Sequence, residues 1–362
     1  MLKNLFLICI INILTIALVE YFVGFFIHQK NIRNFTDTKR VVTPYRPLIN
    51  AWLNSNEFSV PYYINNIGVR GYEKKDIQLD KYSSVLLGDS FSEGWGVPYS
   101  KSFIEQINQT KESKILNFSQ NGSGPLLFYH RLKYLMTKTR LDKVIIQIFD
   151  NDIMDNYRIK NFNPDIKYQI KDDSLFRKIT NWFKANTKIY YLVKLFERKI
   201  RNLPLPSFQF ESLNKVDEIK SDEDIEKQYE LSKNLSKIES FKAGDFGWYL
   251  PNKLNDWSEK ISLHKVYLQK IIDLCNDNGI TLEFIYIPYH GVWYLNKEDK
   301  GKIRNYHQEL LGELSSKNSI KFYDFFSLMS THKNPKSLYF PMDGHLNQDG
   351  HKFVSDTYLN LK

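Results

Sequence analysis

Continuously apolar segments alternate with amphipathic segments over much of the chain. Residues 143–149, with the sequence KVIIQIF, are almost all apolar, which is typical of a strand buried on both faces of a sheet. Shorter segments of the same kind predict further strands at residues 85–88, 114–118, 281–287 and 320–325. Helical patterns lie at residues 103–109, 126–136, 257–276 and 302–316 and in a segment that begins after His345. Such alternation predicts βαβ units around a parallel sheet.

The alternation stops at Asp155 and resumes near Asp256. We therefore expect one domain over residues 81–362, with a helical insertion at about 156–255 and a lead-in segment at 29–80 before it. Within the insertion, residues 175–201 combine an apolar face with many lysines and arginines. Two interpretations stay open: a helix packed on the core with its lysines in solvent, or a helix lying on an anionic membrane.

The N-terminal segment at residues 5–27 is apolar, and Glu20 is its only charged residue. A helix of this length would reach roughly 34 Å, enough to cross a bilayer. No small-x-small cleavage site follows, so we expect a retained single-pass anchor at residues 1–28. A signal peptide and a buried core helix are the alternatives. The lysines and arginines after the segment would by themselves favour a cytoplasmic domain.

Composition limits the classes of protein to consider. Of 362 residues, 42% are hydrophobic and 15% aromatic, which is enough for a large core and argues against global disorder. The net charge of +9 fits a lysine-rich solvated surface or an anionic partner, and no nucleic-acid-binding motif accompanies it. Cys9 and Cys275 predict neither a disulfide nor a metal site, and we expect no cofactor because no phosphate-binding loop or metal-ligand cluster occurs.

The segment VLLGDSFSEGWGV, residues 85–97, ends a predicted strand in Gly-Asp-Ser. Reactive groups of parallel sheets collect beyond the carboxyl ends of the strands, where Ser90 would lie. A serine nucleophile needs an adjacent base, which is itself oriented by a third group. The segment PMDGHLNQDGH, residues 341–351, offers both: His345 as the base and Asp343 as the residue that orients it.

Acyl chemistry also needs hydrogen-bond donors for an oxyanion. Gly122, in the loop NGSG after the second strand, lacks a Cβ, so its backbone N–H can approach closely. Asn151, in FDND after the third strand, can donate from its side-chain amide, and the N–H of Ser90 is a third candidate. Each residue also has a structural interpretation, as a turn residue or a helix cap. Their joint occurrence in order at predicted strand ends favours catalysis.

His351 is a competing base, but it would lie about one turn into the final helix and point elsewhere. Asp89 and Asp152 are expected to hold loops by hydrogen bonds. The remaining histidines considered have no motif around them and are expected to be structural or exposed: His130, His264, His290 and His307.

Together, GDS, the glycine loop, the Asn-Asp pair and the C-terminal Asp and His resemble the SGNH/GDSL hydrolase superfamily, over about residues 64–361 without the insertion. The resemblance implies a flavodoxin-like three-layer α/β/α sandwich with a mostly parallel five-stranded sheet. It implies that Ser90 is the nucleophile, His345 the base and Asp343 its orienting acid. The implied oxyanion hole comprises Ser90, Gly122 and Asn151.

The C-terminal motif departs from the usual family pattern. Most of the superfamily uses Asp-x-x-His, whereas this chain has Asp-x-His, with Met342 at the usual aspartate position. The alginate O-acetyltransferase branch is similar in using Asp-x-His. The lead-in NNIGVRG and the GWGV after the serine also resemble a membrane-anchored or secreted branch. On this resemblance we expect the catalytic domain outside the cytoplasm, against the local lysine count.

Three functions remain open on the sequence. The first is a membrane-anchored ester hydrolase that acts on O-acyl groups of cell-surface glycan. The second is an O-acyltransferase of the same fold that passes the acyl group to a sugar hydroxyl. The third is a non-catalytic glycan-binding protein, against which the complete set of Ser, Asn and His residues argues. The expected partners are thus an ester or O-acylated carbohydrate and a membrane.

Overall fold

The computed structural model describes residues 11–12, 14–22, 45, 47–55, 57–72, 76–110, 114–161, 249–250, 255–295, 297–300, 303 and 305–361. Most of the predicted insertion, including its amphipathic segment at residues 175–201, lies outside the described residues. Much of the predicted anchor does too. The domain boundaries, the insertion and the anchor therefore stay predictions.

Five parallel strands form the central sheet: β4 (Ser84–Leu87), β5 (Ile115–Asn117), β6 (Lys143–Phe149), β7 (Thr281–Ile287) and β8 (Lys321–Asp324). Their order is β5–β4–β6–β7–β8, so β4 lies between the two strands that follow it in the chain. This is the flavodoxin-like order. It confirms the predicted five-stranded parallel sheet and brings the loops after β4, β5 and β6 to one edge.

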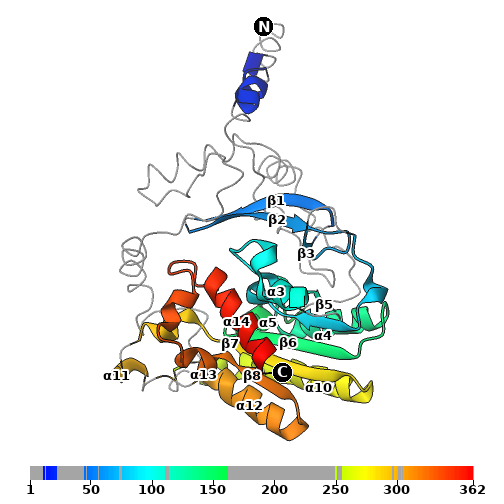
Figure 1. Cartoon of the computed structure of the whole chain (residues 1–362), viewed down its shortest axis with the longest axis vertical. Coiled ribbons are helices and arrows are strands. Elements are labelled where there is room, and N and C mark those ends of the chain that lie inside the picture. Colours follow the sequence, from blue (N-terminus) through cyan, green and yellow to red (C-terminus); the bar gives the residue numbers. More distant parts are fainter. Residues whose placement is uncertain are drawn as a thin grey trace.

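α-Helices connect the strands and cover the sheet (Figure 1): α2 (Ser90–Glu93), α3 (Phe103–Thr110), α4 (Pro125–Met136), α5 (Asp152–Arg158), α10 (Ser258–Asp277), α11 (Lys297–Lys300), α12 (Tyr306–Asn318), α13 (Phe325–Ser330) and α14 (Gln348–Asn360). Leu86 and Ile145 join an apolar cluster with residues of α3, α13 and α14. Val85 and Val144 point the other way, into a cluster with α4, α10 and α12. Successive strand residues thus face opposite helical layers, which confirms the three-layer sandwich.

The described part of the lead-in segment contains regular structure that its mixed sequence did not predict. It contains an antiparallel sheet of β1 (Ile49–Asn54), β2 (Ser59–Ile64) and β3 (Arg70–Gly71), which Figure 1 shows beside the α/β domain. Alternate residues of β1 and β2 are buried, among them Leu53 and Tyr62. They pack in a separate apolar cluster that includes Trp95, from the segment after Ser90.

Arg70 joins this small sheet to the α/β domain. Its side chain is buried, with the guanidinium carbon 4.2 Å from the ring centroid of Tyr62. The guanidinium donates to the carbonyl oxygens of Glu93, Gly94 and Val97, at 3.1 Å for Glu93 and 2.6 Å for Val97. These three carbonyls belong to α2 and the loop after it. The lead-in sheet therefore fixes the segment that follows the candidate nucleophile.

The N-terminal segment is described only in part. Residues 11–12 and 14–22 are helical, and their large apolar side chains are exposed, including Leu14, Leu18 and Phe22. Among the residues that the structure describes, no helix has both the length and the hydropathy needed to cross a bilayer.

Arg70→Met should destabilise the protein by about 3 kcal/mol, because three buried carbonyl oxygens lose a charged donor. The free energy of unfolding, measured by urea titration, checks this expectation. Arg140→Met is the matched control, since that arginine side chain is 94% exposed and should shift stability by no more than about 0.5 kcal/mol. Equal stability of the two variants would show that Arg70 does not hold the loop.

Candidate active site

Ser90 lies directly beyond the carboxyl end of β4, as the first residue of α2. The Asp89 side chain accepts a hydrogen bond from the Phe91 N–H at 2.9 Å and so caps this short helix. Gly94 ends the helix with a φ of 82°, a left-handed conformation that glycine adopts without strain. Ser90 is only 2% exposed. At the first helical position its backbone N–H has no partner within the helix.

The structure brings Ser90, His345 and Asp343 into one hydrogen-bonded chain. Nε2 of His345 lies 2.7 Å from Oγ of Ser90, and Nδ1 of His345 lies 2.5 Å from Oδ1 of Asp343. The His345 and Asp343 side chains are 21% and 16% exposed, so the chain opens to solvent on the histidine side. This is the geometry of a nucleophile, a base and an orienting acid. The Asp-x-His spacing thus allows Asp343 to reach the imidazole.

The turn between Asp343 and His345 depends on Gly344, whose φ is 82°. A Cβ at this position would come within 2.6 Å of the imidazole ring of His290. The His345 ring packs beside Phe91 and Trp95, with centroid distances of 4.9 and 5.8 Å. Aromatic neighbours on the nucleophile segment therefore hold the imidazole in the plane that its two hydrogen bonds require.

The two predicted oxyanion-hole donors other than Ser90 lie in loops beyond the strands that flank β4. Gly122 follows β5 in a turn with a φ of 67° and is buried. Asn151 follows β6 and takes the N-cap position of α5, but its side chain makes no capping hydrogen bond, which removes the helix-cap interpretation. Within the described residues, its buried Oδ1 has no hydrogen-bond partner. The sheet order places these two residues on either side of Ser90, at the same edge.

Buried polar contacts fix the loop that carries Gly122. The Asn121 N–H donates to Oε2 of Glu93 at 2.7 Å, and the Gln120 N–H donates to the Gly88 carbonyl at 3.1 Å. Glu93 is fully buried, and burial raises the pKa of its carboxyl group. Sequence reasoning did not identify Glu93, whose position three residues after the serine gives no local signal of this contact.

Two further aspartates near Ser90 hold the backbone, as expected. Oδ2 of Asp152 accepts from the Phe149 N–H at 3.2 Å, while Asp89 caps α2. Both carboxyl groups are completely buried. Burial raises the pKa of Asp89 to about 7 and that of Asp152 well above its usual range. The loops at the strand ends thus include carboxyl groups that bind protons far more readily than exposed ones.

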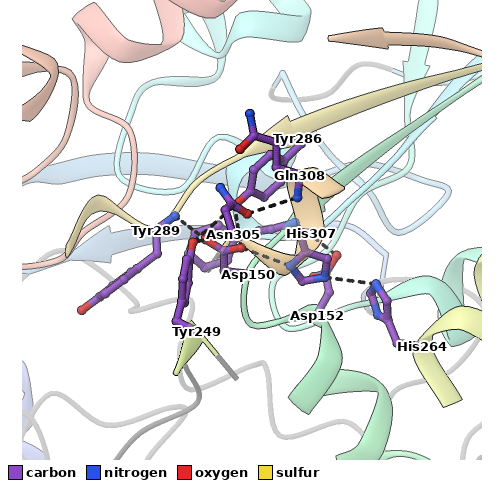
Figure 2. A network of polar contacts seen from close by, with 10 residues as sticks. Asp150, Asp152, Tyr249, His264, Tyr286, Tyr289, Asn305, His307 and Gln308 are labelled. Atoms are coloured by element: carbon purple, nitrogen blue, oxygen red, sulfur yellow. Dashed lines mark hydrogen bonds and ion pairs between the residues drawn. The ribbon is translucent and has the colours of Figure 1, made fainter. Parts of the chain in front are cut away.

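Asp150, the residue before Asn151, is the centre of a buried network that the sequence did not predict (Figure 2). It accepts from the hydroxyl groups of Tyr249 and Tyr286, the latter at 2.8 Å, and from the Tyr289 N–H at 2.6 Å. Nδ1 of His307 lies 3.1 Å from its Oδ1. Tyr249 lies near the end of the predicted insertion, so this carboxylate ties the end of β6 to that segment and to β7.

The network continues through two more buried side chains. Nε2 of His307 lies 3.1 Å from Nε2 of His264, and Nδ1 of His264 lies 3.2 Å from Nδ2 of Asn156. Oδ1 of Asn156 accepts from the Leu126 N–H at 2.9 Å, so the amide nitrogen of Asn156 is the donor to His264. His264 then donates to His307, and His307 to Asp150. In this order each imidazole accepts at one ring nitrogen and donates from the other, and burial lowers the pKa of His264 well below its usual range.

Neither His351 nor His290 competes with His345 for Ser90. His351 points away, and its Nδ1 accepts from the Phe103 N–H at 3.2 Å. His290 is buried against the Asp343 turn, and its ring nitrogens have no hydrogen-bond partner among the described residues. Burial lowers the pKa of His351 to about 3 and that of His290 to about 4. In the part of the chain that the structure covers, no three His, Cys, Asp or Glu side chains are placed to hold a metal ion.

The strand order and the hydrogen-bonded chain from Ser90 to Asp343 have the arrangement that the SGNH/GDSL resemblance implied. No family model and no curated protein matches the chain.

Solved structures with likeness to the chain include a G-D-S-L family lipolytic protein from Desulfitobacterium hafniense DCB-2, at 12% identity over 77% of this chain and 99% of that one, with a TM-score of 0.38. A G-D-S-L family lipolytic protein from Veillonella parvula DSM 2008 has 12% identity over 76% and 95%, with a TM-score of 0.39. A lipase/acylhydrolase from Enterococcus faecalis has 12% identity over 76% and 93%, with a TM-score of 0.35.

The buried His351 should make the protein less stable in acid. Its imidazole binds a proton in the unfolded chain below about pH 6.5 but in the folded chain only below about pH 3. The unfolded state therefore gains protons as the pH falls from 6.5, and stability is lost over that window.

His351→Gln keeps an acceptor for the Phe103 N–H and removes the imidazole that takes up a proton in the unfolded chain. Between pH 6 and pH 4, the slope of unfolding free energy against pH should become smaller by about 1.4 kcal/mol per pH unit than in the wild type. Urea unfolding at a series of pH values measures both slopes. Parallel lines for the two proteins would contradict the buried neutral state of His351.

Proposed function

We propose that this chain is a serine ester hydrolase that acts through an acyl-enzyme on Ser90. The observation that supports the proposal most directly is the chain from Oγ of Ser90 to Nε2 of His345 at 2.7 Å and from Nδ1 of His345 to Asp343 at 2.5 Å. An isolated serine hydroxyl is a weak nucleophile, and a base in hydrogen-bond contact is the feature that activates it. Cofactor chemistry has no role in this mechanism.

In the first step, Nε2 of His345 takes the Ser90 proton while Oγ attacks the ester carbonyl carbon. The carbonyl oxygen becomes an oxyanion that accepts hydrogen bonds from the Ser90 N–H, the Gly122 N–H and the Asn151 side chain. His345 then gives its proton to the leaving alcohol, and the C–O bond to that alcohol breaks. Asp343 holds the imidazole in the tautomer that presents Nε2 to the serine and stabilises its charged form.

The acyl group now on Ser90 must pass to an acceptor. In hydrolysis, a water molecule loses a proton to His345 as its oxygen attacks the acyl carbon. The second tetrahedral intermediate then collapses: the bond between the acyl carbon and Oγ of Ser90 breaks, the free acid leaves, and His345 returns its proton to Oγ. In the alternative, a sugar hydroxyl takes the place of water, and the product is an O-acylated glycan. The Asp-x-His spacing, which resembles the alginate O-acetyltransferase branch, is the observation that favours this second function.

For the substrate we propose small O-acyl groups on cell-surface glycan. This part rests on the resemblance and on the apolar N-terminal segment. The full-length chain is incubated with aryl esters, with acetylated polysaccharides and with an acyl donor plus a sugar acceptor. Release of free acid supports the hydrolase, while acyl groups recovered on the sugar support the transferase. A chain that processes no ester and is not labelled by a serine-reactive phosphonate would support the non-catalytic glycan-binding protein.

We further propose that residues 1–28 anchor the chain in a membrane, with the catalytic domain outside the cytoplasm. Residues 5–27 are long enough for a span, and the exposed apolar side chains of the helical residues 14–22 are consistent with burial in lipid. Orientation follows the resemblance to the anchored branch. If a reporter that is active only in the cytoplasm shows activity when it is fused after Lys362, the catalytic domain lies in the cytoplasm and the proposed orientation is wrong.

Ser90→Ala should abolish turnover, because it removes the nucleophile. His345→Ala should do nearly the same, because the Ser90 hydroxyl then has no base to take its proton. Asn151→Ala should lower kcat about 10²–10³-fold, since the loss of one oxyanion donor raises the barrier by roughly 3–4 kcal/mol. Steady-state kinetics on an ester that the wild type cleaves measures all three variants.

Asn121 provides the matched control, because it neighbours Gly122 and contributes its backbone N–H, not its side chain, to the contact with Glu93. Asn121→Ala should keep kcat within a few-fold of the wild type. Wild-type hydrolysis by purified Ser90→Ala protein would refute the nucleophile assignment.

The full-length chain should stay in the membrane pellet after a high-salt wash and dissolve only in detergent. Apolar burial does not weaken with ionic strength, whereas attachment through the lysine-rich surface would be screened. Fractionation followed by immunoblotting measures the distribution. Release of the chain by salt alone would show an electrostatic attachment instead of a span.

A further inference from the structure

Glu57, in the turn between β1 and β2, reaches the loop that carries Asp343. Its Oε1 accepts from the Met342 N–H at 3.0 Å, and its Oε2 accepts from the Asp343 N–H at 2.6 Å. One carboxylate therefore takes two consecutive backbone donors, each with a separate oxygen. Hydrogen bonds to an ionised carboxylate are shorter and stronger than those between neutral groups. The contact joins residues 285 and 286 positions apart in the chain.

The two N–H groups lie at the tip of a tight turn. Its ends are closed by backbone hydrogen bonds from Phe340 N–H to the His345 carbonyl at 2.8 Å and from Gly344 N–H to the Phe340 carbonyl at 2.9 Å. These bonds fix the base of the turn but not the peptide planes at Met342 and Asp343. Because a side chain leaves the backbone at Cα, the planes on either side of Asp343 set the direction of its carboxylate. Glu57 fixes the plane before it.

The turn that carries Glu57 is itself held firmly. Oγ of Ser55 accepts from the Glu57 N–H at 3.0 Å, and the Ser55 N–H donates to the Phe58 carbonyl at 2.8 Å. The Phe58 ring lies against Phe340, with centroids 4.9 Å apart. The β1–β2 turn thus docks on the Asp343 loop through an aromatic pair and a bidentate carboxylate.

We propose that Glu57 is a positioning residue of the active site, which acts through Asp343 and makes the lead-in sheet part of the catalytic unit. This inference rests on the proposed function for its kinetic consequence. Met342 lies at the usual aspartate position, so the acid of this chain comes from the next residue. In our proposal, the carboxylate of Glu57 holds the loop in the geometry that lets Asp343 reach Nδ1 of His345.

The kinetic test compares Glu57→Ala and Glu57→Gln in the full-length chain. Glu57→Ala should lower kcat about 10- to 100-fold with little change in KM, because misplacement of a group that supports the base has an effect of this size. Glu57→Gln keeps one acceptor oxygen and should recover part of the loss. Ser59→Ala is the matched control, since it removes the 2.6 Å hydrogen bond to Asn54 in the same hairpin and should leave kcat unchanged.

A double-mutant cycle separates positioning from general stabilisation. If Glu57 acts through Asp343, Glu57→Ala should cost little further activity in the Asp343→Ala background. An equal loss in both backgrounds, or wild-type kcat in Glu57→Ala, would overturn the proposal. Glu57→Gln keeps the test valid if the alanine variant fails to fold, because a glutamine variant with wild-type kcat and an unchanged melting temperature would also overturn it.

A measurement without substrate distinguishes failure of this inference from failure of the proposed function. The proton on Nδ1 of His345, shared with Asp343, should give a downfield proton resonance that is lost in Asp343→Ala. In Glu57→Ala this resonance should shift or exchange faster with water, whereas in Ser59→Ala it should persist. An unchanged resonance in Glu57→Ala would refute the positioning role. A chain that shows the shift but cleaves no ester would refute the hydrolase and leave the role of Glu57 intact.

Discussion

The site depends on one imidazole that must satisfy two hydrogen bonds at once. His345 has to present Nε2 to Ser90 and Nδ1 to Asp343, and a rotation of the ring weakens both contacts. Ser90 is fixed by the end of β4 and the start of α2, whereas His345, in the same loop as Asp343, lies 255 residues further along. The parallel sheet solves the first half of this problem, because it gathers the strand ends at one edge. The position of the C-terminal loop that carries Asp343 and His345 depends on further contacts.

Those supports come from the beginning of the chain. Arg70 holds three carbonyl oxygens of the segment after Ser90, and Glu57 holds two amides of the loop before His345. Arg70 lies in β3 and Glu57 in the β1–β2 turn, so the same small sheet contacts the two segments whose separation decides the Ser90–His345 distance. Trp95 packs in the apolar cluster of the lead-in sheet and also lies beside the His345 ring, so it adds a third contact between this sheet and the site.

The sequence predicts the parts of this arrangement that have local signals. Continuous apolar runs locate the strands to within about a residue, because strands buried on both faces need apolar side chains throughout. The motifs around Ser90, Asn151 and His345 identify the candidate chemistry. The lead-in sheet was missed although β1 and β2 alternate, because turn residues around them masked a signal of only six residues each. Glu57 and Asp150 could not be found, since their partners are distant in sequence and no pattern at either residue identifies a particular amide.

The buried carboxyl groups around the strand ends place a constraint on the electrostatics of the site. An oxyanion that forms beside Ser90 would be destabilised by neighbouring negative charge. Asp150 offsets its charge by hydrogen bonds from two tyrosine hydroxyls and an amide. Asp89 follows another route, because burial raises its pKa to about 7, so that it carries a proton in a large fraction of molecules at neutral pH. Hydrogen-bond donors therefore surround Asp150, and a proton neutralises much of Asp89, so in the proposed mechanism neither acid strongly opposes an oxyanion held by the donors of Ser90, Gly122 and Asn151.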